Sequence, residues 1–107
     1  MYVLVTYVPE SHLGQVKEAL FASGAGSMDG YDQCCWQVKG TGQFRPLAGS
    51  HPFLGSEDQL ETVEEWRLEM AVDEEHAAKV VEALRRVHPY EVPAYHLIPV
   101  MTLDAAF

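Results

Sequence analysis

Residues 65–72 alternate strongly, with charged side chains between the apolar ones as far as Met70. Trp66, Leu68, Met70 and Val72 point one way, and Glu65, Arg67 and Glu69 point the other way. Successive side chains of a β-strand lie on opposite faces, so the alternation predicts a strand that is buried on one face and solvated on the other. A half-buried strand of this kind is typical of an antiparallel sheet.

Three further segments have the character of strands. Residues 2–8 are rich in β-branched and aromatic side chains, which predicts a buried strand. Residues 33–39 alternate, with Cys34, Trp36 and Val38 on one face, and predict a second strand antiparallel to residues 65–72. Residues 95–100 predict the last strand of the sheet.

Two segments between these strands have helical periodicity. Apolar residues recur every three or four positions at Leu13, Val16, Ala19 and Leu20, and again at Ala77, Val80, Val81, Leu84 and Val87. Gly24 is expected to end the first helix. Asp73 is expected to cap the second helix, with Glu74 and Glu75 in its first turn, and Pro89 to stop it.

The elements therefore follow the order strand, helix, strand, strand, helix, strand. This order predicts an α+β fold of the ferredoxin-like βαββαβ kind, in which two helices cover one face of a four-stranded antiparallel sheet. The chain is long enough for one domain, residues 1–107, with its own core. Residues 40–55 are rich in glycine and proline and predict a long excursion between two strands, of a kind that often binds a partner.

Sixteen acidic side chains against seven basic ones give the chain a formal net charge of −9. Such a charge repels phosphate backbones, so we expect no nucleic-acid partner. No apolar run reaches the length of a membrane span, and residues 1–6 lack the basic start of a signal peptide, so we expect no membrane partner and a cytoplasmic location. Cys34 and Cys35 are adjacent and have no other cysteine to pair with, which excludes a disulfide framework.

The run His-Pro-Tyr-Glu-Val-Pro at residues 88–93 places an imidazole, a phenol and a carboxylate between two prolines. One interpretation is structural: the prolines set the turn from helix to strand, His88 caps the helix end, and Tyr90 packs its ring with its hydroxyl at the rim. The other interpretation is functional: His88 and Glu91 converge on a ligand or a metal ion. Their spacing matches no defined metal motif, and the sequence leaves both interpretations open.

Residues 40–46 are the second candidate for a site. The Gly-x-Gly start resembles a phosphate-binding loop, but the remaining glycine and the helix that such a loop needs are missing. Arg45 is a candidate to grip an anion and Phe44 to anchor a partner, while the alternative is a hairpin extension softened by glycine. No nucleophile motif and no His-Glu-x-x-His zinc motif occurs, so we expect the protein not to be an enzyme.

Two families resemble this chain. The run at residues 88–93, followed by Pro99 and Val100, resembles the C-terminal signature of the CutA proteins, which are associated with divalent-cation tolerance. Most of residues 2–100 resembles the inserted domain of YqfO-type members of the Nif-three-like family, which also occurs as short stand-alone proteins. The matching positions lie at residues 24–26, 31–32, 34, 40–46, 49, 52–55, 60–61, 63–64, 67 and 69. The chain departs from the family pattern at Val92 and His96, where the family tends to carry a second acid and an aspartate.

The resemblance implies a PII-like and CutA-like fold that forms homotrimers. It also implies a non-enzymatic binding or regulatory module with a small-molecule or metal ligand in clefts between subunits. The residues expected to line such a cleft are Tyr31, Phe44, Arg45, His88, Tyr90 and Glu91. One alternative is a CutA-type protein that binds a divalent metal ion, copper or zinc, through His88 and Glu91. Another is an accessory domain for a Nif-three-like protein, whose dinuclear metal core this chain lacks.

Overall fold

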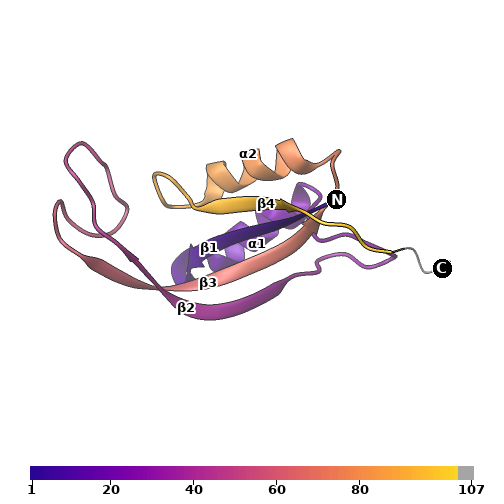
Figure 1. The fold of residues 1–107 in the computed structure, drawn as a ribbon, viewed down its shortest axis with the longest axis horizontal. Helices are drawn as coiled ribbons and strands as arrows, with labels where there is room; N and C mark the ends of the chain where they lie inside the picture. The colour runs from indigo at the N-terminus through magenta and orange to yellow at the C-terminus, as the bar shows by residue number, and fades with distance from the viewer. Residues whose placement is uncertain (104–107) are drawn as a thin grey trace.

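The fold comes from a computed structural model that describes residues 1–103 of the chain. The elements run in the predicted order, with a short 3₁₀ turn before the first helix (Figure 1). They are β1 (Tyr2–Pro9), η1 (Glu10–His12), α1 (Leu13–Ala22), β2 (Trp36–Phe44), β3 (Glu61–Val72), α2 (Ala77–Val87) and β4 (Tyr95–Pro99). The predicted single domain of residues 1–107 includes residues 104–107, which lie outside the described residues, and that boundary stays a prediction.

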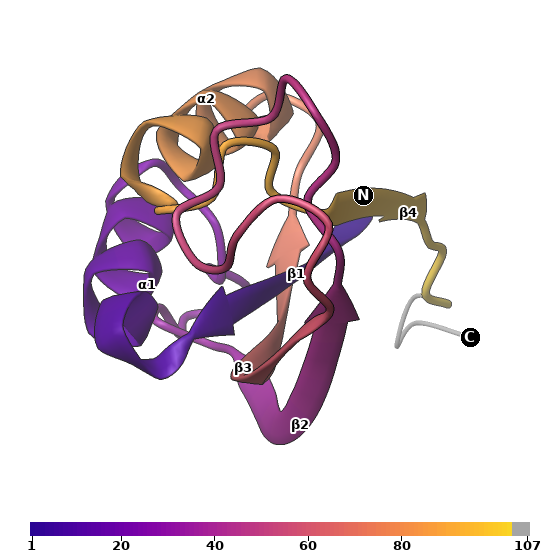
Figure 2. The same cartoon turned by 90° about the vertical axis from the view of Figure 1, so that its left-hand side faces the viewer.

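The four strands form one antiparallel sheet in the order β2-β3-β1-β4. β1 pairs with β3 and with β4, and β2 pairs with β3, each time antiparallel. Both helices lie on the same side of this sheet (Figure 2). The predicted ferredoxin-like α+β fold, with two helices on one face of a four-stranded antiparallel sheet, is therefore confirmed.

The hydrophobic core lies between the helices and one face of the sheet. Leu4 of β1 lies opposite Met70 of β3 and opposite Leu97 of β4, so these three side chains share the face that the helices cover. The helices contribute Val16, Leu20, Val80 and Leu84, which are fully buried. Each such aliphatic side chain stabilises the folded state by about 1.5–3 kcal/mol relative to an exposed one. The periodicities that predict the core are thus confirmed.

The opposite face of the sheet carries no helix, and it is called the open face below. Arg67 and Glu69 of β3, which were predicted to be solvated, lie on it. Trp36 and Val38 of β2 lie directly opposite these two residues, so they share the open face. Trp36 is 58% exposed and Val38 is 43% exposed. The open face therefore presents large apolar side chains to solvent in the single chain.

The hairpin of β2 and β3 is longer than the sequence predicts. The predictions that the second strand covers residues 33–39 and that the third begins at Glu65 are wrong, because β2 runs from Trp36 to Phe44 and β3 begins at Glu61. Gly40 and Gly42 pair with residues of β3 instead of forming a loop. The ladder satisfies their backbone hydrogen-bonding groups, and this outweighs the low strand propensity of glycine. The loop at the tip, residues 45–60, is called the hairpin loop below.

The ends of the helices follow the predicted signals with one shift. Gly24 follows Ser23, the C-cap residue of α1, and has a φ of +111°, a conformation that favours glycine. The Asp73 carboxylate accepts the backbone N–H of His76 at 2.9 Å, so Asp73 caps the turn that leads into α2. Glu74 and Glu75 therefore precede α2 instead of forming its first turn. Neither helix of the described residues has the length and apolar character needed to cross a membrane.

Candidate functional site

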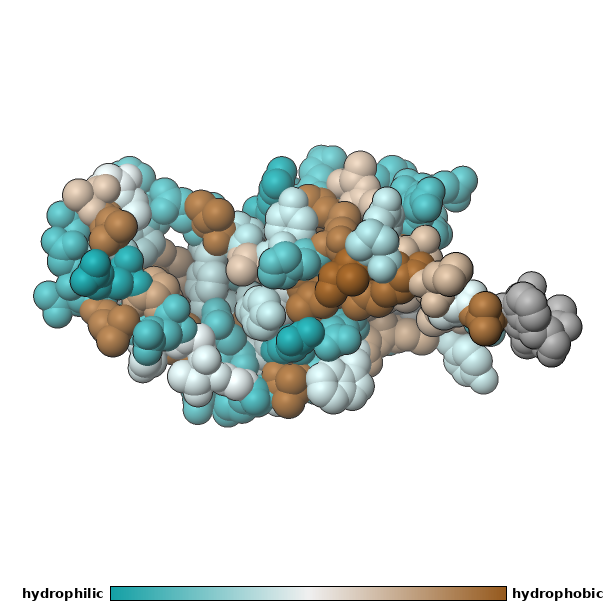
Figure 3. Space-filling model, in the orientation of Figure 1, coloured by the Kyte–Doolittle hydropathy of each residue, from teal (hydrophilic) through white to brown (hydrophobic). Residues whose placement is uncertain are grey.

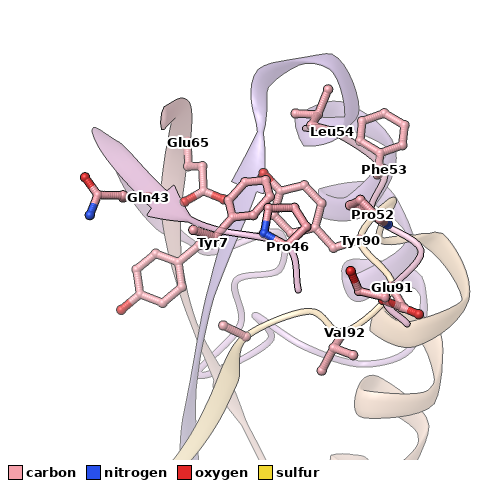
Figure 4. A pocket seen from close by; sticks show the side chains of 13 residues that line it. Tyr7, Gln43, Pro46, Pro52, Phe53, Leu54, Glu65, Tyr90, Glu91 and Val92 are labelled. Carbon is pink, nitrogen blue, oxygen red and sulfur yellow. The ribbon is translucent and has the colours of Figure 1, made fainter. Parts of the chain in front are cut away.

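A cleft of about 330 Å³ lies where the hairpin loop meets the turn between α2 and β4. That turn, residues 88–94, is called the corner below. Figure 3 shows a hollow between the tip of the hairpin and the body of the domain, and Figure 4 shows the side chains around the cleft. The cleft is lined by Tyr7, Gln43, Phe44, Pro46, Ser50, Pro52, Phe53, Leu54, Glu65, Tyr90, Glu91, Val92 and Ala94. Its volume is at the lower end of the range for small-molecule sites.

The sheet contributes its open face to this cleft. Tyr7 lies opposite Arg67, and Glu65 precedes Arg67 by two residues on the same strand. Tyr7 and Glu65 therefore share the open face. Phe44 lies opposite Glu61 and joins the same face at the far end of the hairpin. The cleft therefore lies where these open-face side chains meet the hairpin loop and the corner, which form its other walls.

His88 lies behind the cleft and is 6% exposed. Its Nε2 atom lies 2.7 Å from the carbonyl oxygen of Tyr7, and its Nδ1 atom lies 3.1 Å from the backbone nitrogen of Tyr90. A carbonyl only accepts and an N–H only donates, so Nε2 carries the proton and Nδ1 is the acceptor. Burial lowers the pKa of His88 below its ordinary value, against the opposing effects of the Tyr7 carbonyl and the Glu65 charge. The ring is therefore a neutral link between β1 and the corner.

Tyr90 carries this link on to β3. Its ring packs against that of His88 with centroids 4.7 Å apart, and its hydroxyl donates to the Glu65 carboxylate at 2.7 Å. Burial raises the pKa of Tyr90, and the hydrogen bond to Glu65 and the charge of Glu65 raise it further. A Cβ on Gly42 would overlap the same carboxylate, so the glycine leaves the space that the Glu65 side chain occupies. Tyr90 thus remains a protonated donor at the centre of the cleft.

The hairpin loop is held against the corner by aromatic contacts and one hydrogen bond. The rings of Phe44 and Phe53 each lie with their centroids 6.4 Å from that of Tyr90. Phe53 also meets His12 edge to face at 5.4 Å. The Glu91 carboxylate accepts the backbone N–H of the residue at position 51 at 3.1 Å. Together these contacts fold the tip of a long hairpin back onto the body of the domain.

The structure brings together only part of the site expected from the sequence. Phe44, Tyr90 and Glu91 line the cleft, and His88 supports it from behind. Arg45 follows Phe44 but is exposed and does not line the cleft. Tyr31 is 74% exposed and lies in the connection between α1 and β2, which joins the end of β3 away from the cleft. Whether these six residues bind a ligand stays a prediction.

The sequence analysis missed Glu65 and the role of the hairpin loop in the cleft. The alternation of residues 65–72 assigned Glu65 to a solvated strand face. Only the tertiary structure shows that the Glu65 carboxylate accepts the hydroxyl of Tyr90. Phe53 and Leu54 lie in the loop, whose fold has no periodic signal. The one available signal was the pair of prolines, Pro46 and Pro52, which line the cleft with these residues.

In this arrangement His88 offers no free ring nitrogen to a metal ion, and His88 with Glu91 as metal ligands stays a prediction. Both ring nitrogens of His88 are occupied by hydrogen bonds within the chain, so neither has a free lone pair for a cation. Asp73, Glu75 and His76 instead place one ligand atom each within 4.8 Å of one another, before α2. His76 Nδ1 lies 2.7 Å from the Asp73 carboxylate, and the hydrogen bonds from His76 lower the pKa of Asp73. The sequence analysis assigned Asp73 to a helix cap and Glu75 to the first turn of the helix.

Comparisons with known proteins confirm both predicted resemblances. The family model described as CutA1 divalent ion tolerance protein matches residues 54–107. A protein of Halalkalibacterium halodurans named GTP cyclohydrolase 1 type 2 homolog is 48% identical over 99 residues, which cover 92% of this chain and 27% of that protein. The chain thus spans about a quarter of the length of the curated relatives that it matches.

Solved structures agree with this assignment. A Bacillus cereus protein related to NIF3 superposes with a TM-score of 0.81 at 36% identity, over 94% of this chain and 26% of that chain. The periplasmic divalent cation tolerance protein CutA of Archaeoglobus fulgidus superposes with a TM-score of 0.69 over 98% of this chain and 88% of that chain. At 15% identity the second match shows the fold alone. The cytoplasmic location expected for this chain stays a prediction.

Replacing His88 with Gln tests the neutral, buried ring. Because the pKa of His88 is below its ordinary value of 6.5, the unfolded chain binds a proton below pH 6.5 that the folded chain does not. The free energy of unfolding should therefore fall as the pH falls through this interval, by up to about 1.4 kcal/mol per pH unit. His88→Gln should lose this dependence, as measured by urea unfolding at about pH 7.5 and about pH 5.5.

His96→Gln is the matched control, since His96 is an exposed residue of β4. It should keep the pH dependence of the wild type. A His88→Gln variant that loses as much stability on acidification as the wild type would contradict the neutral ring.

Proposed function

The chain belongs to the CutA1 divalent ion tolerance protein family, and from this premise we propose that it is a non-enzymatic module that binds a small molecule in the cleft between the hairpin loop and the corner. The cleft is the observation that supports this function. Its walls are mostly apolar, and a few polar groups, Gln43, Glu65, Tyr90 and Glu91, converge on it. Apolar walls with few convergent polar groups are the usual composition of a small-molecule site.

The absence of catalysis is part of the proposal. The hydroxyl of Tyr90 is hydrogen-bonded to Glu65, and both ring nitrogens of His88 are hydrogen-bonded within the chain. These two side chains therefore hold the walls of the cleft in place. The name GTP cyclohydrolase 1 type 2 homolog belongs to relatives about four times the length of this chain. We therefore do not extend the activity in that name to this chain.

A homotrimer is the second part of the proposal. Trp36 and Val38 on the open face are exposed in the single chain, and so is Ile98 of the edge strand β4. Apolar side chains gather over β4 in the space-filling view (Figure 3). A neighbouring subunit that covered these exposed apolar side chains would also cover the sheet edges. Tyr31 lies away from the cleft of its own chain, so Tyr31 belongs to such a cleft only if a neighbouring subunit supplies that residue.

A divalent cation is the alternative ligand, and the family supports it. In this chain the residues that would hold the ion are Asp73, Glu75 and His76, whose oxygen and nitrogen ligands suit zinc or copper. The expected pair of His88 and Glu91 is disfavoured, because the ring of His88 would have to give up a hydrogen bond to bind an ion.

An accessory role is the remaining alternative. The chain is similar to one segment, about a quarter, of longer proteins, so it is a candidate to dock on a separate metal-core protein. Mixing the chain with the Halalkalibacterium halodurans relative lacking the matched segment tests this. Co-elution of the two would support docking, and separate elution would refute it.

Blocking the mouth of the cleft tests the binding function. Val92 is 81% exposed and lines the cleft, so Val92→Trp should fill the entrance without disturbing the core. At least one component of a defined mixture of amino acids, organic acids, nucleosides and amines should bind the wild type in ligand-observed NMR. Val92→Trp should weaken that binding by about tenfold or more. Leu60→Trp, in the exposed part of the loop outside the cleft, is the control and should bind as the wild type does.

The proposal fails if no component binds, or if the wild type and both variants bind equally.

The trimer has its own test in light scattering. A mass of about 36 kDa, three times the 12.0 kDa of the chain, is expected for the wild type. Trp36→Glu with Val38→Glu should lower the mass toward that of one chain, because two charges would be buried in the interface. Ala48→Glu, in the exposed hairpin loop, should leave the mass unchanged, and a monomeric wild type would refute the trimer.

Titration calorimetry with zinc chloride and copper sulfate tests the cation alternative. His76→Ala should weaken cation binding by about tenfold or more, because one of three ligands is lost. His96→Ala, which removes an exposed histidine elsewhere, should bind as the wild type does. Loss of affinity in His88→Gln with none in His76→Ala would instead restore the pair predicted from the sequence.

A further inference from the structure

The cleft contains negative charge and no positive charge. Among the thirteen residues that line it there is no lysine, arginine or histidine, while Glu65 and Glu91 are both present. Arg45 and His51, the basic residues of the hairpin loop, do not line the cleft. The chain as a whole carries a net charge of −9, which adds to the local potential. An anionic ligand would therefore be repelled, and a cationic ligand would be attracted.

Each carboxylate of the cleft uses one oxygen in a hydrogen bond within the described part of the chain and leaves the other oxygen without one. Glu65 accepts the hydroxyl of Tyr90 through Oε2, and Glu91 accepts a backbone N–H through Oε1. In the part of the chain that the structure describes, Oε1 of Glu65 and Oε2 of Glu91 accept no hydrogen bond from a side chain or from the backbone. The contacts that are made hold both carboxylates in place, so a ligand with N–H donors would meet fixed acceptors.

The surface between the two carboxylates is aromatic and apolar. Figure 4 shows Glu65 and Glu91 on either side of Tyr90. The rings of Phe44 and Phe53 lie beside Tyr90, each with its centroid 6.4 Å away. An alkyl chain gains free energy by covering such rings, and an ammonium group is also attracted to their faces.

We propose that the cleft selects organic cations and that linear alkyl diamines fit it best, with one ammonium group at Glu65, the other at Glu91, and the methylene chain against the aromatic rings between them. This inference rests on the proposed function, since it names the ligand class of the same cleft. A monoamine would engage only one carboxylate, and a diol would form neutral hydrogen bonds alone. Charge-assisted hydrogen bonds are roughly twice as strong as neutral ones, so the diamine should bind tightest.

The test uses diamines as the probes, from 1,3-diaminopropane to 1,6-diaminohexane. They are compared with butylamine, 1,4-butanediol and the dicarboxylate adipate at physiological salt, where nonspecific attraction to an acidic surface is screened. Calorimetry measures the affinity, and amide NMR shifts locate the binding. One diamine length should bind about tenfold or more tightly than butylamine. Its shifts should map to the hairpin loop and the corner.

Two variants remove the charge and keep the shape. Glu65→Gln and Glu91→Gln each retain an oxygen that accepts the existing hydrogen bond within the chain, so the cleft should remain folded. Each should weaken diamine binding by about tenfold or more. Glu57→Gln is the matched control: it makes the same charge change in the exposed part of the hairpin loop, outside the cleft, and should bind as the wild type does.

The outcomes separate this inference from the proposed function. If adipate or butanediol binds the cleft as tightly as the diamines, or if the three Glu variants bind diamines equally, the selection of organic cations is overturned while the cleft remains a binding site. If neither the diamines nor any component of the metabolite mixture shifts the amides of the hairpin loop and the corner, both the binding function and its ligand class are overturned.

Discussion

The buried, neutral ring of His88 is the interaction on which the shape of this domain most depends. It donates to a carbonyl of β1 and accepts from the corner, and its neighbour Tyr90 extends the connection to Glu65 of β3. Three segments far apart in the sequence are thereby held in one position. A protonated ring would place a hydrogen on Nδ1, where the Tyr90 N–H already points, so the link requires the neutral imidazole.

This link explains why a long hairpin does not project freely into solvent. The ladder of β2 and β3 continues through Gly40 and Gly42 beyond the helices, and an isolated two-stranded ribbon is only marginally stable. Phe44 and Phe53 pack beside Tyr90 and return the tip to the body of the domain. The same contacts that stabilise the tip leave the cleft between it and the corner, so the binding function and the stability of the hairpin share their residues.

The comparisons relate this chain to two groups of proteins. The CutA1 family model matches residues 54–107, and 92% of the chain is similar to one segment of a much longer relative. Within this chain, the run at residues 88–93 acts first as a structural joint, since the His88 nitrogens are occupied. The proposed choice of ligand depends on the acidic and aromatic side chains around Tyr90.

The sequence alone determined the order of the elements, the core face of each and the resemblance to known families, because strand and helix periodicities are local properties of the chain. It did not determine the true length of the hairpin, the role of Glu65 or the unavailability of His88 for a metal ion. These depend on contacts between residues that are as many as 81 positions apart. Only the tertiary structure decides which distant groups share hydrogen bonds. The order of the residues therefore does not show that both ring nitrogens of His88 are occupied.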